Sequence, residues 1–345
     1  MSHRCPSPPY RNTRLSQDPW AALAGEFQSL GGTAENVRCQ PCEQGVGLFV
    51  TDPSKPACVS VPQQLLVPTE QVALVDGCPC LIDTDKQPEH YINWFNAYQR
   101  RLGYTEPKRT RIDRFERGLA ALPLQTLSIL ESMGLLNLEL RHRGSWQDVV
   151  FRQYLHSRSF LYRGRRVLMP MVDLINHSPT AQPYLTSSGV QVSGAFDEEV
   201  LVRYNETDPL GRFFNHGFAS AEPIAFSYPA SLPLDRHQRR QQIAGLVSAQ
   251  IERLPDPVPL ANDLGKHQRI EVVTLEHLPN LPPQPLDHGD LADFYDDAFW
   301  LNQVQLMALS DSLKGCHGDC ARALKAAIGY QQQALCRLVR VFAHG

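Results

Sequence analysis

The feature that most constrains this chain is an apolar run that ends in a cluster of polar side chains, at residues 167–178. The run Val-Leu-Met-Pro-Met-Val leads directly into Asp173, Asn176 and His177. So short an apolar run predicts a buried strand over 167–174. The end of that strand would hold amide and imidazole groups in a fixed frame, which suits an adenine edge or a ligand ammonium group. A tight turn with a structural histidine is the alternative interpretation.

The remaining hydrophobic pattern predicts an α+β fold. Residues 46–75 have the pattern of short strands separated by proline-containing turns, and 200–204 form another short apolar run. From about residue 87 to 160, apolar side chains recur at helical spacing. Two more helices are predicted at 291–309 and 321–342. The second has an apolar stripe, which we interpret as core packing.

The charge balance favours neither a nucleic-acid nor a membrane partner. Lys and Arg number 33, Asp and Glu number 36, and the formal net charge is -3. A nearly neutral chain has no general attraction to polyanions. Basic side chains gather at 100–114, but acidic residues lie among them, so we interpret the segment as a solvated helix face. No stretch approaches the ~18 consecutive apolar residues of a membrane span.

The N-terminal segment lacks the apolar core of a secretory signal. Several prolines also oppose an amphipathic helix there, so residues 1–30 are predicted to be a flexible leader. The nine cysteines are an odd number. Reduced thiols in a cytoplasmic protein therefore explain them better than disulfides. The pairs Cys39-x2-Cys42 and Cys78-x-Cys80 could supply four zinc ligands, but their spacing is unlike the usual zinc knuckles, and no metal is predicted.

Four short motifs occur in an informative order. They are Gly-Val-Gly-Leu at 45–48, Ser-Arg-Ser-Phe at 157–160, Pro-Met-Val-Asp-Leu-Ile-Asn-His-Ser at 170–178 and His-Gly-Phe at 216–218. This ordered set resembles the SET domain of the Rubisco large-subunit methyltransferase-like branch, over about 44–219. The third motif carries most of the resemblance, since a glycine pair alone is a weak signal.

The resemblance implies an architecture. A β-rich SET core would occupy residues 31–221, with a helical insert at about 87–150. A mostly helical domain, similar to the substrate-binding domain of the family, would occupy 222–345. It also implies that the chain is a protein methyltransferase with S-adenosylmethionine as its cofactor and a protein as its substrate.

The resemblance further implies a role for each matched position. Glycines at 45 and 47 would let the backbone approach the cofactor, because glycine has no Cβ. Arg158 would meet the cofactor carboxylate with its guanidinium fork. Asp173 would orient the turn that presents Asn176 and His177 to the adenine and ammonium regions. Tyr204 would line the site. The full implied cofactor-binding set is Gly45, Gly47, Leu48, Arg158, Asp173, Asn176, His177 and Phe218.

One position departs from the family. The residue before Gly217-Phe218 is normally the catalytic tyrosine, and here it is His216, or Asn215 if the alignment shifts by one. We therefore predict His216 and Tyr204 as the catalytic pair, with Tyr228 as another source of a hydroxyl. A protein-lysine N-methyltransferase is the first hypothesis. A catalytically impaired SET module that binds cofactor and a protein partner, or a protein-histidine methyltransferase, is the alternative.

Overall fold

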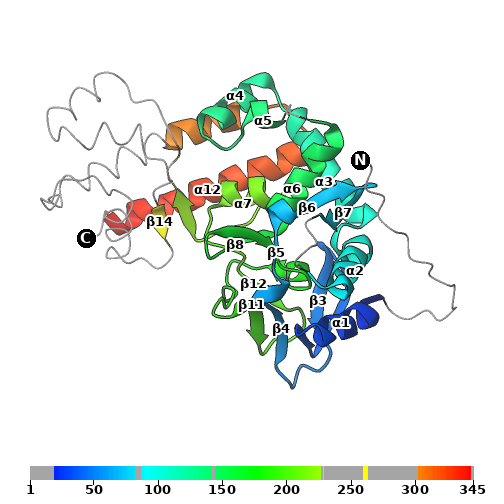
Figure 1. Ribbon diagram of the computed structural model, residues 1–345. Helices are drawn as coiled ribbons and strands as arrows, with labels where there is room; N and C mark the ends of the chain where they lie inside the picture. Colours follow the sequence, from blue (N-terminus) through cyan, green and yellow to red (C-terminus); the bar gives the residue numbers. More distant parts are fainter. Residues whose placement is uncertain are drawn as a thin grey trace, which may run out of the picture.

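Small sheets and a set of helices occupy different parts of the molecule, as Figure 1 shows. The structure is a computed structural model, and it describes residues 19–82, 87–141, 144–226, 228, 259–262 and 302–342. Strands precede and follow a helical stretch, and further helices come near the C-terminus. The expected α+β class is therefore confirmed.

The first strands form two small antiparallel sheets. β4 (Ala57–Pro62) pairs with β1 (Thr33–Glu35) on one side and with β11 (Gly189–Gly194) on the other. β2 (Val37–Cys42) pairs with β3 (Gly45–Val50) through a two-residue turn. Alternate residues of β4 are buried, the pattern of a strand with one face on the core.

Two more small sheets are built from short strands. β9 (Arg165–Leu168) pairs with β8 (Ser159–Tyr162) and β5 (Val67–Pro68), all antiparallel. β6 (Val72–Val75) and β7 (Cys78–Leu81) form a hairpin. The sequence pattern at 46–75 thus corresponds to several short strands, as predicted.

The strand predicted at 167–174 ends early. It corresponds to β9, which stops at Leu168, and a 3-10 turn at Val172–Leu174 follows. Pro170 has no backbone N–H, and Met171 has a positive φ of 76°, so neither residue can continue a strand. The chain then forms β10 (Asn176–His177).

The polar end of the motif is held by a parallel pair. β10 pairs in parallel with β12 (Leu201–Val202), which lies in the apolar run predicted at 200–204. The pairing joins Asn176 to Leu201 and His177 to Val202. Both polar residues are buried, at 7% and 6% exposed, so their side chains must find partners inside the protein.

The prediction of a flexible leader at 1–30 is wrong for residues 19–29, which form a helix. Helix α1 (Pro19–Ser29) packs Trp20, Leu23 and Phe27 into the core, and the Trp20 indole donates to the Val37 carbonyl at 3.3 Å. Three large apolar side chains on one helix face outweigh the flanking prolines that suggested a leader. Residues 1–18 lie outside the described residues.

Among the described residues, five α-helices begin within the predicted helical insert. They are α2 (Glu89–Tyr98), α3 (Glu106–Ala120), α4 (Leu124–Ser132), α5 (Leu138–Arg141) and α6 (Trp146–Arg158). A capping box between Ser145 and Asp148 fixes the start of α6. Since α6 runs directly into β8, its last residue Arg158 is placed next to the sheets.

The C-terminal helix predicted at 321–342 is confirmed as α12 (Asp319–Phe342). Of the helix predicted at 291–309, residues 302–309 are helical and the others lie outside the described residues. α12 packs against α7 (Pro209–His216) and against the small antiparallel pair of β13 (Ile224–Phe226) and β14 (Pro259–Asn262).

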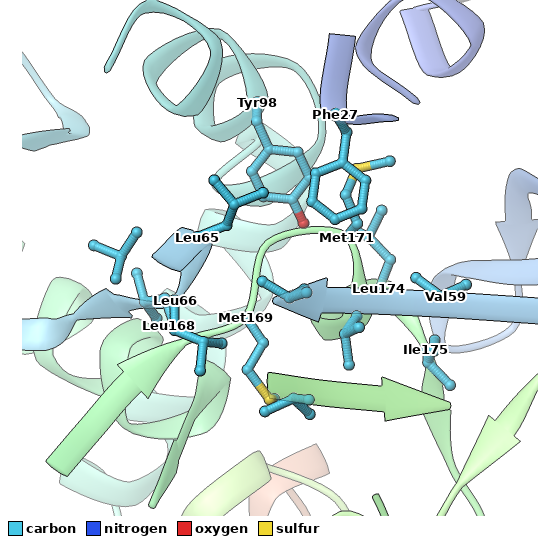
Figure 2. Packing of buried hydrophobic residues seen from close by; sticks show 14 of the residues in the cluster. Phe27, Val59, Leu65, Leu66, Tyr98, Leu168, Met169, Met171, Leu174 and Ile175 are labelled. Carbon is cyan, nitrogen blue, oxygen red and sulfur yellow. The ribbon is translucent and has the colours of Figure 1, made fainter. Parts of the chain in front are cut away.

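Two hydrophobic clusters support these elements. The first joins α1, α2 and the sheets, and Figure 2 shows Met169, Met171 and Leu174 inside it. The second joins residues 119–136 of the insert to α7 and to the C-terminal helices. The second cluster crosses the predicted limits at 150 and 221, so the insert and the C-terminal helices share one core. No helix in the described ranges is long and apolar enough to cross a membrane.

Candidate functional site

The turn between β9 and β10 presents a buried carboxylate. Asp173 is 6% exposed and accepts a hydrogen bond from the Tyr98 hydroxyl. Burial raises the pKa of Asp173, although the charges of Lys108 and Arg158 act in the opposite direction. The guanidinium of Arg158 also donates to the Asp173 backbone carbonyl. Side chains from α2 and α6 therefore both bind Asp173 in this turn.

A second polar cluster forms where β3 passes β10. The amide nitrogen of Asn176 donates to a Glu199 carboxylate oxygen at 2.7 Å and to the Val46 carbonyl at 3.4 Å. A Cβ at Gly47 would lie 2.5 Å from Glu199 Oε1 and 2.7 Å from Asn176 Nδ2. Glycine is thus required at 47 for β3 to lie against Asn176 and Glu199.

Gly47→Ala should destabilise the protein. The added methyl would push into the Asn176–Glu199 hydrogen bond, and overpacking of this kind costs about 1–3 kcal/mol. Urea denaturation measures the loss. Gly25→Ala is a matched control, because Gly25 is exposed in α1 with nothing within 4 Å of an added Cβ. It should be neutral or stabilising by about 0.5–1 kcal/mol. Equal stability of Gly47→Ala and the wild type would contradict this account of β3.

Gly45 lies under a basic side chain. Its φ is +112°, a conformation that favours glycine, and the Arg111 guanidinium lies where its Cβ would be. Arg111 also donates to the Gln44 carbonyl. Leu48, in contrast, is fully buried in the first hydrophobic cluster. Its side chain packs in the core, and its carbonyl accepts a hydrogen bond from the Val200 N–H at 2.8 Å.

His177 is fully engaged within the protein. Its Nε2 lies 2.9 Å from a Glu222 carboxylate oxygen, and its Nδ1 accepts a hydrogen bond from the Tyr204 N–H at 3.3 Å. Burial lowers the pKa of His177, so the ring is neutral and its Nε2–H donates to Glu222. The imidazole holds the Tyr204 backbone in place, and both of its nitrogens are already hydrogen bonded.

The Glu222 carboxylate joins this histidine to α7. Arg212, fully buried, donates from Nε to Glu222 at 2.8 Å, and from Nη1 and Nη2 to the Asn205 side chain and carbonyl at 2.9 and 3.0 Å. Burial would raise the pKa of Glu222, but hydrogen bonds from His177 and Arg212 outweigh it and the pKa is lowered. The Arg212–Glu222 ion pair therefore holds two groups next to Tyr204. Glu222 holds His177, which accepts from the Tyr204 N–H, and Arg212 holds Asn205.

Four rings meet beside this ion pair. The Tyr204 ring centroid lies 5.0 Å from that of His216 and 5.2 Å from that of His177. Phe218 lies 6.1 Å from His216 and 6.0 Å from His177. The Tyr204 hydroxyl donates to the Ile175 carbonyl at 2.8 Å. The motif around 216–218 and the motif around 170–178 are thus brought together.

His216 is held neutral by its surroundings. Burial lowers the pKa of His216 well below the ordinary histidine value, and the charges of Arg212 and Arg158 act in the same direction. A neutral imidazole offers one donor and one acceptor. An ordinary histidine titrates near ~6.5, and the surroundings of His216 move its titration to more acidic pH.

A cavity of about 330 Å³ opens next to these rings. Four predicted site residues line it, namely Arg158, Asp173, Tyr204 and His216. The other lining residues are His156, Ser157, Ser159, Phe160, Leu161, Arg166, Met169, Tyr184, Asn205 and Asn215. The six remaining predicted residues are not among its walls. Of these, His177 contacts the lining residue Tyr204, and Phe218 contacts the lining residue His216.

Several residues of this region were not predicted. Glu199, Glu222 and Arg212 hold the site together, and His156 lies 2.7 Å from the Asn215 amide oxygen through its Nε2. Glu199 directly precedes the apolar run at 200–204, and this position next to a predicted strand could have marked it as a site residue. Glu222 is 45 residues from its partner His177, and no local spacing reveals such a pair.

Tyr228 does not line the cavity. Its hydroxyl donates to Asp208, which caps the start of α7 by accepting from the Gly211 N–H at 2.7 Å. The Gln331 amide of α12 donates to the same carboxylate at 2.8 Å. Asp208 therefore joins α12 to α7, and the Tyr228 hydroxyl is bound to it. In the ranges that the structure describes, no three His, Cys, Asp or Glu side chains are grouped to hold a metal ion.

Comparison with known proteins gives distant structural likenesses. No protein-family model and no curated protein sequence matches the chain. A structure of Rubisco LSMT bound to AdoMet is similar at 15% identity and a TM-score of 0.44, over 95% of this chain and 92% of that one. The SET domain of LSMT bound to lysine and AdoHcy is similar at 14% identity and a TM-score of 0.40, over 94% and 91%.

A third structure, Rubisco LSMT bound to sinefungin and monomethyllysine, gives 14% identity and a TM-score of 0.44, over 95% and 92% of the two chains.

Proposed function

We propose that this chain is an S-adenosylmethionine-dependent methyltransferase of the SET type. It acts on a side-chain nitrogen of another protein, and lysine is the first candidate for the methylated residue. One observation carries the proposal. Arg158, Asp173, Tyr204 and His216 come from four separate sequence segments, and all four line one cavity. Three of the four sequence motifs therefore contribute to one cavity.

The residues present fit the cofactor. A cavity of about 330 Å³ falls in the range of about 300–1,000 Å³ that small-ligand sites occupy. Arg158 offers a guanidinium fork for a carboxylate. Asp173 supplies a carboxylate in the cavity wall, which suits an ammonium or a ribose hydroxyl. Gly47 keeps β3 against Asn176, because any side chain there would collide with the amide.

When bound, the cofactor supplies a methyl group on a sulfonium for in-line transfer to a nearby nitrogen. This chain's residues then have two tasks. They align the nitrogen, and they favour its neutral form, since a lysine amine has a reference pKa of ~10.4. The positive charge of Arg158 disfavours a protonated amine in the cavity. The neutral His216 imidazole can accept a hydrogen bond from the incoming nitrogen.

A second function uses the same site without turnover. The position before Gly217-Phe218 holds His216, and the Tyr204 hydroxyl proton is already donated to the Ile175 carbonyl. These observations favour a module that binds cofactor and a protein partner but transfers no methyl group. A histidine substrate is the remaining alternative, because a neutral imidazole needs no deprotonation before it accepts a methyl group.

Methyl transfer tests the proposal directly. The full chain is incubated with S-adenosylmethionine carrying a labelled methyl group and a protein extract. We expect S-adenosylhomocysteine to accumulate and the label to appear on protein, with mass spectrometry assigning it to lysine or histidine. Arg158→Gln should reduce both signals strongly, because it weakens cofactor binding. Cofactor binding without S-adenosylhomocysteine formation would instead establish the non-catalytic module.

A further inference from the structure

The cavity of the candidate site is open to solvent at three of its lining residues. Leu161, Arg166 and Asn205 are exposed. Other lining residues, such as Asp173, are buried. Asn205 is already bound, because its amide oxygen accepts a hydrogen bond from Arg212 at 2.9 Å. Leu161 and Arg166 are therefore the side chains that the mouth of the cavity offers to a partner, and we call them the rim pair.

The rim pair lies on the hairpin of β8 and β9. The two residues are paired opposite each other in the register of these antiparallel strands, so their side chains project from the same face of the sheet. Leu161 is 64% exposed. One exposed leucine on a protein surface needs no explanation by itself. Here it stands beside a cation in the wall of the candidate site, and the two together offer an apolar and a positively charged contact.

The charge of Arg166 is uncompensated. Its guanidinium donates to the Ser159 hydroxyl at 3.4 Å, and in the described part of the chain no carboxylate forms an ion pair with it. Arg165, the preceding residue, is paired with Glu70 at 2.5 Å. Arg163, in the turn of the hairpin, donates to a neutral side chain at 2.9 Å. The hairpin at the mouth of the cavity therefore carries positive charge, which attracts a carboxylate.

An aromatic wall connects β8 with His216. The Phe160 ring centroid lies 5.2 Å from that of Tyr184, and Tyr184 stacks on Tyr204 at 6.4 Å with an angle of 5° between the rings. Tyr204 in turn lies beside His216. All four rings line the cavity. A side chain that enters beside the rim pair and follows this wall reaches His216, and its neighbours in the substrate sequence stay at the mouth.

We infer that the rim pair selects the protein substrate by the residues next to the methylated one: an acidic side chain pairs with Arg166, and an apolar side chain packs on Leu161. The inference rests on the proposed function and names the class of its substrate. Exposed charges are screened by salt, so the preference for acidic neighbours should weaken as ionic strength rises.

Mapping of methylated sites tests the inference. The full chain and labelled S-adenosylmethionine are incubated with a protein extract, and mass spectrometry locates each labelled residue. For the wild type we expect acidic residues next to the labelled one more often than around other residues of the same type in the extract. Arg166→Glu should label sites with basic neighbours instead. Arg165→Glu is the matched control and should label the wild-type sites, because Arg165 is on the same strand but does not line the cavity.

Peptides copied from a mapped site measure the size of the effect. Replacing the acidic neighbour with glutamine should lower kcat/KM of the wild type by about 2- to 5-fold, the range of an exposed ion pair. Arg166→Gln should show no such difference between the two peptides. Leu161→Ser should raise KM by about 5-fold with kcat unchanged, because the apolar contact is the same before and during methyl transfer. Ile82→Ser is its control, since Ile82 is 55% exposed and does not line the cavity.

Cofactor binding by each variant, measured by calorimetry, shows that the site survives the substitution. If the mapped sites show no excess of acidic neighbours, or if Arg166→Gln keeps the wild-type peptide preference, the inference is overturned and the proposed function stands. The same holds if Leu161→Ser leaves KM unchanged. If the wild type labels no protein at all, both fail together.

Discussion

Arg212→Met should destabilise the protein by about 3–5 kcal/mol, the cost of leaving one partner of a buried ion pair uncompensated. Arg212 is fully buried and Glu222 is 2% exposed, so water cannot replace the lost charge. The midpoint of urea denaturation measures the effect. Arg165→Met is the matched control, because the Arg165–Glu70 pair has 61% and 58% exposed side chains. A surface pair of this kind contributes at most about 1 kcal/mol.

The double variant Arg212→Met with Glu222→Gln separates charge from packing. Removing both charges leaves no uncompensated ion, so the double variant should be more stable than Arg212→Met alone. His177 keeps a hydrogen-bond acceptor in glutamine. If the arginine variant loses no more than the Arg165→Met control, the ion pair does not hold Tyr204 and His177 in place.

His216→Ala should lose about 100-fold or more of any methyl-transfer rate while it still binds S-adenosylmethionine. The expected loss is that of a group that positions or accepts a proton in the transition state. Protonation of the substrate lowers the rates of the wild type and the alanine variant equally. The ratio of the wild-type rate to the variant rate therefore reports on His216 alone. Because the pKa of His216 lies well below the ordinary histidine value, this ratio should stay constant from pH 8 to 6.5.

The ratio should fall only at more acidic pH, where the imidazole becomes charged beside Arg158 and Arg212 and can no longer accept a hydrogen bond. In His216→Tyr this acidic loss should be absent, since a phenol stays neutral there. Cofactor binding measured at each pH shows that the fold survives. Wild-type turnover in the alanine variant would remove His216 from the mechanism and make Tyr204 the next group to test.

The sequence predicted which polar residues of one motif lie together. Asp173, Asn176 and His177 follow one apolar run, and the structure holds them together in a turn and a two-residue strand. The α12 helix was also predictable, because its apolar stripe has helical spacing. These features depend on neighbours in sequence, which a local pattern can reveal.

The parts that were missed depend on long-range contacts. Lys108 belongs to a basic run, and only the packing of α3 in the folded chain buries it. The Glu222–His177 bond spans 45 residues. The end of β9 was misplaced because Met171 adopts a positive φ, which no residue type but glycine signals strongly. Local composition carries no information on such contacts.

The most direct test of the central claim is a titration of the wild-type chain and of Arg158→Gln with S-adenosylmethionine by calorimetry. The account predicts saturable binding of one cofactor per chain, unchanged by a metal chelator, and at least about 10-fold weaker binding in Arg158→Gln, which loses a charged hydrogen bond. Absence of binding to the wild type, or equal affinity of the two proteins, would contradict it.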